Sequence, residues 1–341
     1  MKKVLVFYGG MSREHDISMM TGRAVAASLA DAGWTPVPVV ISRDGLFSFP
    51  GDDACQSAGP WYRFDQAVPM IAAIKPACVF IGLHGTFGED GRIQSLCDLL
   101  DLPYVGSDSI GSAIGIDKWA TKAVFLAAGI PTSPARMLQG ADLEDPAIVE
   151  AACLEIGFPM VLKATREGSS FGVAIVRDSQ GFQSALAAVR TCSDMILFEK
   201  FQKGREFSVP VIEDPLTGLP RALPVIEIVV HKAEFFDYST KYDPKAADEI
   251  CPAPIEPDLA GRMSAAAIKA HRALMLSGYS RTDFIATADG CVWALETNTL
   301  PGMTAFSLLP KSAAVAGITY PELLDALIRR ALARHAADSR Q

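Results

Sequence analysis

Short apolar runs alternate with helix-like patterns through the first third of this chain. Residues 3–7, 39–41 and 77–83 are apolar runs of strand length, whereas residues 17–32 and 93–100 have the spacing of helices with one apolar face. Parallel strands need a crossover segment between them, which is usually a helix. The alternation therefore predicts an α/β unit in which helices cover a mostly parallel sheet.

The pattern changes around residues 107–117, and the two prolines within residues 130–134 indicate a linker. A compact α+β unit is expected after it. Its predicted elements are strands at 160–164, 173–176 and 195–200 and a helix at 180–190.

A third region follows, with strand-like runs at 206–212 and 223–230 and a helix at about 257–277. The polar stretch 231–254 between them is too long for an ordinary connection. We expect it to be a lid or binding loop.

Composition limits the classes of protein that remain. A chain of 341 residues with 50% hydrophobic content is long enough for two or three globular domains. Its net charge of -8 gives no support to non-specific nucleic-acid binding. Seven separated cysteines without a C-x-x-C pair predict neither a disulfide framework nor a zinc site. No apolar run reaches membrane-spanning length, so we expect a cytoplasmic protein without a membrane partner.

Residues 281–298 read as two strands joined by a tight turn at Asp289-Gly290, a strong signal for a two-residue hairpin loop. Counting outward from that turn places Asp283 directly opposite Glu296. A shift of the turn by one residue would remove this pairing.

The same register places Arg281 opposite Asn298, and the four side chains then project from one face of the ribbon. Facing carboxylates repel unless a proton or a cation lies between them. Two carboxylates and an amide oxygen are a donor set suited to Mg²⁺. The alternative is a solvated pair on an exposed face, with Arg281 neutralising one partner.

Three glycine-rich loops follow predicted strands, at residues 9–18, 83–91 and 163–172. The first lacks the G-x-G-x-x-G spacing of a dinucleotide site, so an ordinary strand–helix turn is an equal alternative. The second places His84 among glycines at a strand end, which favours a binding loop over a structural histidine. The third joins Lys163 to hydroxyl and backbone donors that could cover phosphates, although it could equally be a polar hairpin.

In their order, these segments resemble the D-alanine:D-alanine ligases of the ATP-grasp superfamily over nearly the whole chain. The matching segments are GGMSRE from residue 9 with Ser18, LHGTFGEDG from 83, DK from 117, REGSS from 166, DY from 237 with KY from 241, RTD from 281 and ETNTLPGMT from 296. Chance agreement of so many ordered segments is negligible.

The resemblance implies a mixed α/β and α+β protein. An N-terminal Rossmann-like parallel-sheet domain, residues 1–117, would bind the first D-alanine. A two-lobed ATP-grasp fold would follow, with a central lobe at 118–203 and a C-terminal lobe at 204–341 that includes a mobile loop at about 231–254. Family members are usually dimers, and we expect a homodimer.

The resemblance also implies that ATP lies between the two lobes, with Lys118 and Lys163 on the phosphates. Read from its residues alone, Lys118 could instead be a solvated helix residue. The remaining implied ATP-binding residues are Glu199, Lys200, Phe201 and Gln202 for the adenine, Glu206 for the ribose, and Lys241. Asp283, Glu296 and Asn298 match the family's ligands for two Mg²⁺ ions, for which Mn²⁺ can substitute.

In the implied reaction, the carboxylate of one D-alanine attacks the γ-phosphate of ATP, and the amine of a second D-alanine attacks the resulting acyl phosphate. The product is D-alanyl-D-alanine for peptidoglycan precursor synthesis, released with ADP and phosphate. The implied roles are Glu14 for the first ammonium, His84 near the first substrate, Arg281 and the Gly302 N–H for the oxyanion, and Ser307 with Arg281 for the second carboxylate.

The polar stretch would close over the site and exclude water, with Tyr242 linked to Ser169 and Glu14. A tyrosine there resembles the dipeptide-forming ligases, whereas relatives that use D-lactate tend to carry histidine.

Three other functions compete with this interpretation. A ligase of the same fold could make D-alanyl-D-lactate, D-alanyl-D-serine or another dipeptide. A nucleotide-dependent oxidoreductase is disfavoured by the missing dinucleotide fingerprint and by the paired acids at Asp283 and Glu296. A catalytically silent binding protein is disfavoured because every matched catalytic position is filled.

Overall fold

The computed structural model of the protein describes residues 2–50, 59–168, 171–231 and 247–338. The N-terminal unit is built on a six-stranded sheet with the order β4-β3-β2-β1-β5-β6. Its strands are β1 (Lys3–Gly9), β2 (Thr35–Ile41), β3 (Phe47–Ser48), β4 (Trp61–Tyr62), β5 (Cys78–Ile81) and β6 (Tyr104–Val105). Strands β2, β1, β5 and β6 pair in parallel, and β3 and β4 add an antiparallel edge. The predicted, mostly parallel sheet is confirmed.

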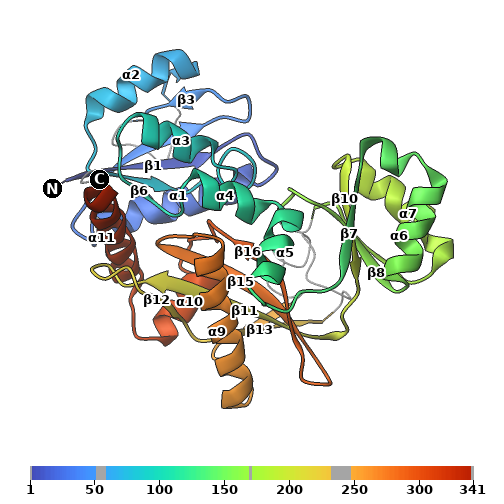
Figure 1. Ribbon diagram of the computed structural model, residues 1–341. Coiled ribbons are helices and arrows are strands. Elements are labelled where there is room, and N and C mark those ends of the chain that lie inside the picture. The colour runs from blue at the N-terminus through green and yellow to red at the C-terminus, as the bar shows by residue number, and fades with distance from the viewer. Residues whose placement is uncertain (1, 51–58, 169–170, 232–246, 339–341) are drawn as a thin grey trace.

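Three helices accompany this sheet in the upper left of Figure 1. They are α1 (His15–Leu29), α2 (Phe64–Ile74) and α3 (Arg92–Leu99). The side chains of residues 4–8 in β1 are fully buried. Parallel strands are covered on both faces, which explains why β1 is a continuous apolar run rather than an alternating one.

The last helix of the chain, α11 (Tyr320–Asp338), returns to the N-terminal unit. Leu323, Leu327 and Ile328 belong to the same buried cluster as the strands β1 and β5. The indole N–H of Trp34 donates to Asp325 at 3.0 Å, which fixes the helix against the sheet. Residues from the two ends of the chain therefore share one core.

The central unit is a four-stranded antiparallel sheet with the order β7-β10-β8-β9, drawn on the right of Figure 1. Its elements are β7 (Ala135–Gln139), a 3₁₀ helix (Gly140–Leu143), α6 (Pro146–Ile156), β8 (Met160–Ala164), β9 (Val173–Val176), α7 (Ser179–Arg190) and β10 (Met195–Lys200). Asp178 caps α7 by accepting from the backbone N–H groups of Gln180 and Gly181. All four elements predicted here are confirmed.

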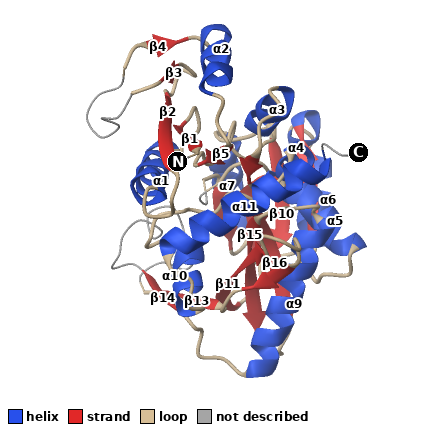
Figure 2. Ribbon diagram, turned by 90° about the vertical axis from the view of Figure 1, so that its left-hand side faces the viewer, coloured by secondary structure: helices blue, strands red, loops and turns tan. Residues whose placement is uncertain are grey.

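The C-terminal unit holds a second six-stranded sheet with the order β14-β13-β11-β15-β16, and β12 pairs with β11. The strands are β11 (Gly204–Glu213), β12 (Pro220–Ala222), β13 (Ile226–Val230), β14 (Ala247–Ile250), β15 (Tyr279–Thr287) and β16 (Val292–Asn298). The helices around them are α4 (Ser109–Ile116), α5 (Lys118–Ala127), α9 (Pro257–Ala273) and α10 (Leu308–Val315). In Figure 2 the long helices α9 and α11 lie beside these strands.

Phe125 of α5 and Met263 of α9 pack with Phe207 and Phe284 of the C-terminal sheet in one buried cluster. The helix that begins at Lys118 is thus anchored by its apolar side to the C-terminal sheet, while its first residue faces the central unit.

The expectation of one continuous loop at 231–254 is wrong for part of that range. Residues 247–250 form strand β14, which pairs with β13 at the sheet edge. Its side chains alternate between half-buried and exposed, and polar residues are usual on an edge strand because one side faces water. Residues 232–246 lie outside the described residues.

The predicted pairing of Asp283 with Glu296 and of Arg281 with Asn298 is confirmed, but the predicted two-residue turn is wrong. The N–H of Gly290 donates to the carbonyl of Thr287 at 2.9 Å, and the Thr287 N–H donates to the Cys291 carbonyl at 3.0 Å. These bonds enclose a three-residue loop.

A two-residue type I′ turn needs positive φ at both central residues, and of the pair Asp289-Gly290 only Gly290, at +83°, has it. The register shifts back between Asp283 and Phe284, where a bulge leaves Leu295 without a cross-strand partner on β15. The extra residue in the turn and the bulge at Leu295 offset each other, so Asp283 still lies opposite Glu296. Within the described part of the chain, no helix is long and apolar enough to cross a membrane.

Candidate active site

Two predicted site residues lie in loops that leave neighbouring parallel strands. Glu14 follows β1 at the start of α1, and His84 follows β5. Strand β1 pairs with β2 on one side and β5 on the other, so the two loops leave the sheet where the strand order reverses. Crevices at such points are the usual ligand sites of open α/β sheets.

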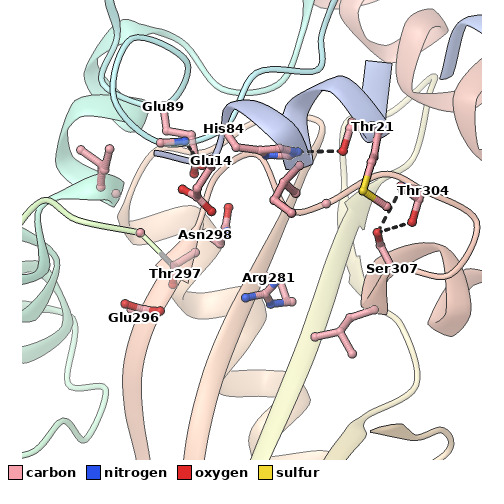
Figure 3. Close-up of a pocket in the computed structure, with 18 of the residues that line it drawn as sticks. Glu14, Thr21, His84, Glu89, Arg281, Glu296, Thr297, Asn298, Thr304 and Ser307 are labelled. Atoms are coloured by element: carbon pink, nitrogen blue, oxygen red, sulfur yellow. Dashed lines mark hydrogen bonds between the residues drawn. The ribbon is translucent and has the colours of Figure 1, made fainter. Parts of the chain in front are cut away.

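These loops form one wall of a cavity of about 580 Å³, a volume usual for small-molecule sites. Figure 3 shows Glu14 and His84 from the N-terminal unit above Arg281, Glu296 and Asn298 from the β15–β16 hairpin, and all five line this cavity. Gly302 and Ser307, which lie between β16 and α10, also line it.

A second cavity of about 140 Å³ lies between the central and C-terminal sheets. The predicted ATP-binding residues that line it are Lys118, Lys163, Glu199, Lys200, Phe201, Gln202 and Glu206, together with the predicted metal ligand Asp283. Lys118, Arg281, Glu296 and Leu308 line both cavities and form their common wall.

Every predicted site residue within the described ranges therefore lines one of two adjoining cavities. Ser169, Lys241 and Tyr242 lie outside the described residues. The roles assigned to all of these residues stay predictions.

Arg281 and Asp283 are buried neighbours on one face of β15. The guanidinium donates to both carboxylate oxygens, from Nε at 3.0 Å and from Nη2 at 2.9 Å. Ser208 of the adjacent strand β11 also donates to Asp283 at 2.5 Å, which follows from the direct pairing of these two positions. The bidentate bond between Arg281 and Asp283 holds the planar guanidinium in one orientation.

Lys118 begins α5, and its Nζ reaches back into the site. Asp117 caps the helix by accepting from the N–H groups of Trp119 and Ala120. Lys118 Nζ lies 3.2 Å from Glu296 and donates to the carbonyl of Glu167 at 2.7 Å. The ammonium group thus connects the hairpin to the loop after β8.

Glu199 lies between two lysines in the protein interior. On the paired strands β8 and β10, Lys163 lies opposite Leu197 and Glu199 lies opposite Val161. Lys163 and Glu199 are therefore diagonal neighbours, and they form an ion pair. Burial alone would raise the pKa of Glu199, but Lys163 and Lys122 outweigh it and hold that pKa below its ordinary value. Glu199 is therefore an ionised acceptor.

Lys122 is the most prominent residue here that the sequence did not single out. It lies on α5 one turn after Lys118, is 2% exposed, and its Nζ lies 2.6 Å from Glu199. It also donates to the hydroxyl of Thr132 at 2.7 Å and to the carbonyl of Ser133 at 3.0 Å. Its helical spacing from Lys118 was the one available signal.

The carboxylate of Glu14 fits against two glycines. A Cβ atom at Gly168 would lie 2.3 Å from Oε2 of Glu14, and one at Gly85 would lie 2.9 Å from the same atom. No other residue type could approach this closely. Nearby, burial and the charge of Glu14 raise the pKa of Glu89 to about 8, so Glu89 is mostly protonated at neutral pH.

The donor set at the hairpin fits a hard divalent cation. Asp283 and Glu296 occupy paired positions, and Asn298 lies two residues after Glu296 on the same face of β16. Together they offer two carboxylates and an amide oxygen. Among the described residues, no cluster of three or more His, Cys, Asp or Glu side chains could hold a metal. Mg²⁺ commonly takes one or two carboxylates and completes its shell with water and substrate phosphates. The second cavity places Asp283 and Glu296 beside the lysines predicted to bind phosphate.

Two protein-family models match the chain. One, described as the D-ala D-ala ligase N-terminus, covers residues 3–107, and the other, the D-ala D-ala ligase C-terminus, covers residues 124–329. Among its relatives, the D-alanine--D-alanine ligase of Geobacter sulfurreducens is 38% identical over 96% of this chain and 93% of its own length. That of Citrifermentans bemidjiense is 38% identical over 97% of this chain and 96% of its own.

Solved structures agree with these matches. The D-alanine-D-alanine ligase from Coxiella burnetii has a TM-score of 0.83 and 28% identity, covering 99% of this chain and 96% of its own. The VanG D-Ala:D-Ser ligase from Enterococcus faecalis also has a TM-score of 0.83, with 27% identity over 97% of this chain and 99% of its own. The resemblance inferred from the motifs is confirmed: the chain belongs to the D-alanine:D-alanine ligase family, whose members are ATP-dependent ligases of the ATP-grasp fold.

Proposed function

We propose that this protein joins two D-alanine molecules into D-alanyl-D-alanine, with ATP converted to ADP and phosphate, for peptidoglycan precursor synthesis. The observation that carries this proposal is the common wall of the two cavities. A carboxylate bound in the larger cavity and a γ-phosphate bound in the smaller one would meet at Lys118, Arg281 and Glu296.

A carboxylate is a poor acyl donor, so it must first be activated. Attack of the first D-alanine carboxylate on the γ-phosphate gives an acyl phosphate, and the amine of the second D-alanine then displaces phosphate. In this proposal Glu14 binds the first ammonium group and Ser307, with Arg281, binds the second carboxylate. Arg281 and the Gly302 N–H stabilise the oxyanion of the tetrahedral intermediate.

The ATP site is the smaller cavity. Lys118 and Lys163 neutralise phosphate charge, Glu199 to Gln202 hold the adenine, and Glu206 binds the ribose hydroxyls, with Lys241 as a further contact. Glu199 is suited to a base that offers an amino group, because an ionised carboxylate only accepts hydrogen bonds.

Asp283, Glu296 and Asn298 would hold two Mg²⁺ ions, or Mn²⁺ in their place. When bound, these ions supply positive charge to the phosphoryl oxygens. Arg281 and Lys118 flank the two carboxylates and offset their charge, so this wall is close to neutral before an ion binds.

We further propose that the segment around Tyr242 closes over the site with Ser169 and Glu14, and that Tyr242 favours D-alanine as the acceptor. A homodimer in the cytoplasm is the expected state.

The test is phosphate release from ATP and Mg²⁺ with D-alanine, L-alanine or no amino acid, with mass analysis of the product. We expect equal amounts of phosphate and D-alanyl-D-alanine when D-alanine is the amino acid supplied, and neither product with L-alanine or without an amino acid. D-Serine and D-lactate, each supplied together with D-alanine, test the acceptor. A mixed product formed in preference to D-alanyl-D-alanine would replace the proposal with the same-fold alternative, and no turnover from folded protein would reject it.

A further inference from the structure

The imidazole of His84 is enclosed by contacts on both of its nitrogens. His84 is 6% exposed. Its Nδ1 lies 2.9 Å from the backbone carbonyl oxygen of Leu300, and its Nε2 lies 2.8 Å from the hydroxyl of Thr21. Figure 3 shows the contact with Thr21, which points away from Glu14 and Arg281.

The chemistry of these partners assigns the protons. A carbonyl oxygen only accepts, so Nδ1 must carry the hydrogen in the bond to Leu300. In the neutral ring Nε2 then accepts, and the Thr21 hydroxyl donates to it. Burial lowers the pKa of His84 and outweighs the opposing effect of the Glu14 charge, which favours this neutral form.

Both ring nitrogens are therefore used within the protein, and neither is left to bind a substrate. The backbone around the ring is held as well. Ser12 donates to the carbonyl of His84 at 2.6 Å, and the N–H of Gly85 donates to Glu89 at 2.9 Å. The loop presents the ring in one fixed orientation.

Leu300 lies two residues before Gly302. Its N–H donates to Asn298 at 3.1 Å, while its carbonyl accepts from His84, so this residue is held from both sides. The three groups in line come from different parts of the chain: Thr21 from α1, His84 from the loop after β5, and Leu300 from the segment after β16. The hydrogen bonds among Thr21, His84 and Leu300 therefore connect the N-terminal unit to the segment that carries Gly302.

We infer that His84 is a positioning residue: with Thr21, it fixes the Leu300 carbonyl and so aims the Gly302 N–H, rather than binding the first substrate itself. This inference rests on the proposed function for its kinetic consequence, since an N–H aimed at the oxyanion acts in the transition state. Loss of the positioning should lower kcat and leave the KM of the first D-alanine nearly unchanged. If His84 bound the first substrate directly, its loss would instead raise the KM of the first D-alanine and leave kcat nearly unchanged.

Two substitutions of His84 separate its two bonds. In His84→Asn the amide nitrogen can occupy the place of Nδ1 and still donate to Leu300, whereas His84→Gln extends toward Thr21 and loses that donor. We expect kcat to fall by about tenfold to a hundredfold in His84→Gln, less than removal of an oxyanion donor costs. His84→Asn keeps the bond to Leu300 but lacks the bond to Thr21, so only a several-fold loss of kcat is expected.

Thr21→Val removes the other bond without changing the shape of the side chain. Thr299→Val is the matched control, because the buried Thr299 hydroxyl has no hydrogen-bond partner among the described residues. We expect a several-fold loss of kcat for Thr21→Val and none for Thr299→Val. If both His84 variants raise the KM of the first D-alanine and Thr21→Val behaves as the control does, the inference is wrong.

Amide hydrogen exchange gives a readout that needs no turnover. Thr21→Val and His84→Gln should speed exchange at residues 300–304 by about fivefold, since one hydrogen bond of ordinary strength is lost, and Thr299→Val should not. Unchanged exchange in all variants would overturn the positioning role. If the wild-type protein makes no dipeptide, the proposed function fails, and this exchange experiment still decides the role of His84.

Discussion

The Nζ atom of Lys122 lies 2.6 Å from a carboxylate oxygen of Glu199, and both side chains are almost fully buried. The same ammonium group donates to Thr132 and Ser133, in the linker between the central and C-terminal units. One lysine therefore supports both the acceptor predicted to bind adenine and the segment that joins two sheets.

Lys122→Met should destabilise the protein strongly. Removing one partner of a buried ion pair leaves an uncompensated charge, which typically costs about 3–5 kcal/mol. The free energy of unfolding from urea titration checks this, with Lys203→Met on the surface as the control. Adding Glu199→Gln to Lys122→Met should recover part of the loss. Equal stability of the Lys122 and Lys203 variants would show that the pair contributes nothing.

Glu296→Gln and Asp283→Asn should each remove most Mg²⁺-dependent activity. Each takes one charge from the predicted metal site, and metal stabilisation of phosphoryl charge is worth several kcal/mol, so a loss of about a hundredfold or more is expected. The measurement is turnover against Mg²⁺ concentration, with circular dichroism to verify folding. Asp289→Asn, at the exposed tip of the same hairpin, should retain wild-type turnover. Normal activity of Glu296→Gln would reject the metal assignment.

The stability of the protein should fall in acid through Glu213, a buried carboxylate on β11. Burial would raise its pKa, but bonds from His271, Arg330 and the Gly278 N–H outweigh this and lower the pKa from 4.5 to about 2. Because the folded-state pKa is depressed, the stabilisation is present above pH 4.5 and is lost as the pH falls toward 2.

Urea unfolding between pH 6 and pH 2.5 checks this prediction. Wild-type protein should lose more stability over the range than Glu213→Gln, by as much as about 3 kcal/mol. The variant should be the weaker protein at pH 6, where it lacks the ionised partner of Arg330. Glu150→Gln, on the exposed side of α6, should follow the wild-type pH dependence. Parallel curves for wild type and Glu213→Gln would contradict the assignment.

Gly168→Ala should weaken binding of the first D-alanine. The added Cβ would lie 2.3 Å from Oε2 of Glu14, so that carboxylate must move. Loss of one charge-assisted hydrogen bond predicts a KM for the first substrate raised about tenfold or more. Gly261→Ala, in open space on α9, should leave the KM unchanged and stabilise the helix. An unchanged KM in Gly168→Ala would show that the close fit of Glu14 against Gly168 is not needed for binding of the first substrate.

The parallel sheet and the paired carboxylates could both be predicted from the sequence. Continuous apolar runs such as residues 4–8 indicate a strand buried on both faces. The facing positions of Asp283 and Glu296 were predicted correctly although the turn was not, because the three-residue loop and the bulge at Leu295 compensate. Local turn signals alone did not determine that result.

Lys122 and Thr21 could not be found in the same way. A lysine on a helix is usually solvated, and nothing in its neighbourhood along the chain predicts three buried acceptors contributed by the linker and β10. Thr21 has the same difficulty, because its partner His84 is 63 residues away. Such contacts depend on how separate sheets pack, which periodicity does not encode. Strand β14 escaped because an edge strand tolerates the polar composition of a loop.

The return of α11 to the N-terminal sheet affects how the chain is made. During synthesis, strands β1 to β6 leave the ribosome well before residues 320–338, whose leucines complete their core. Until α11 has been synthesised, the N-terminal unit exposes the apolar surface that this helix later covers. Exposed apolar surface of this kind promotes association with other chains. Truncation before Tyr320 should therefore give an aggregating protein rather than a shorter stable one.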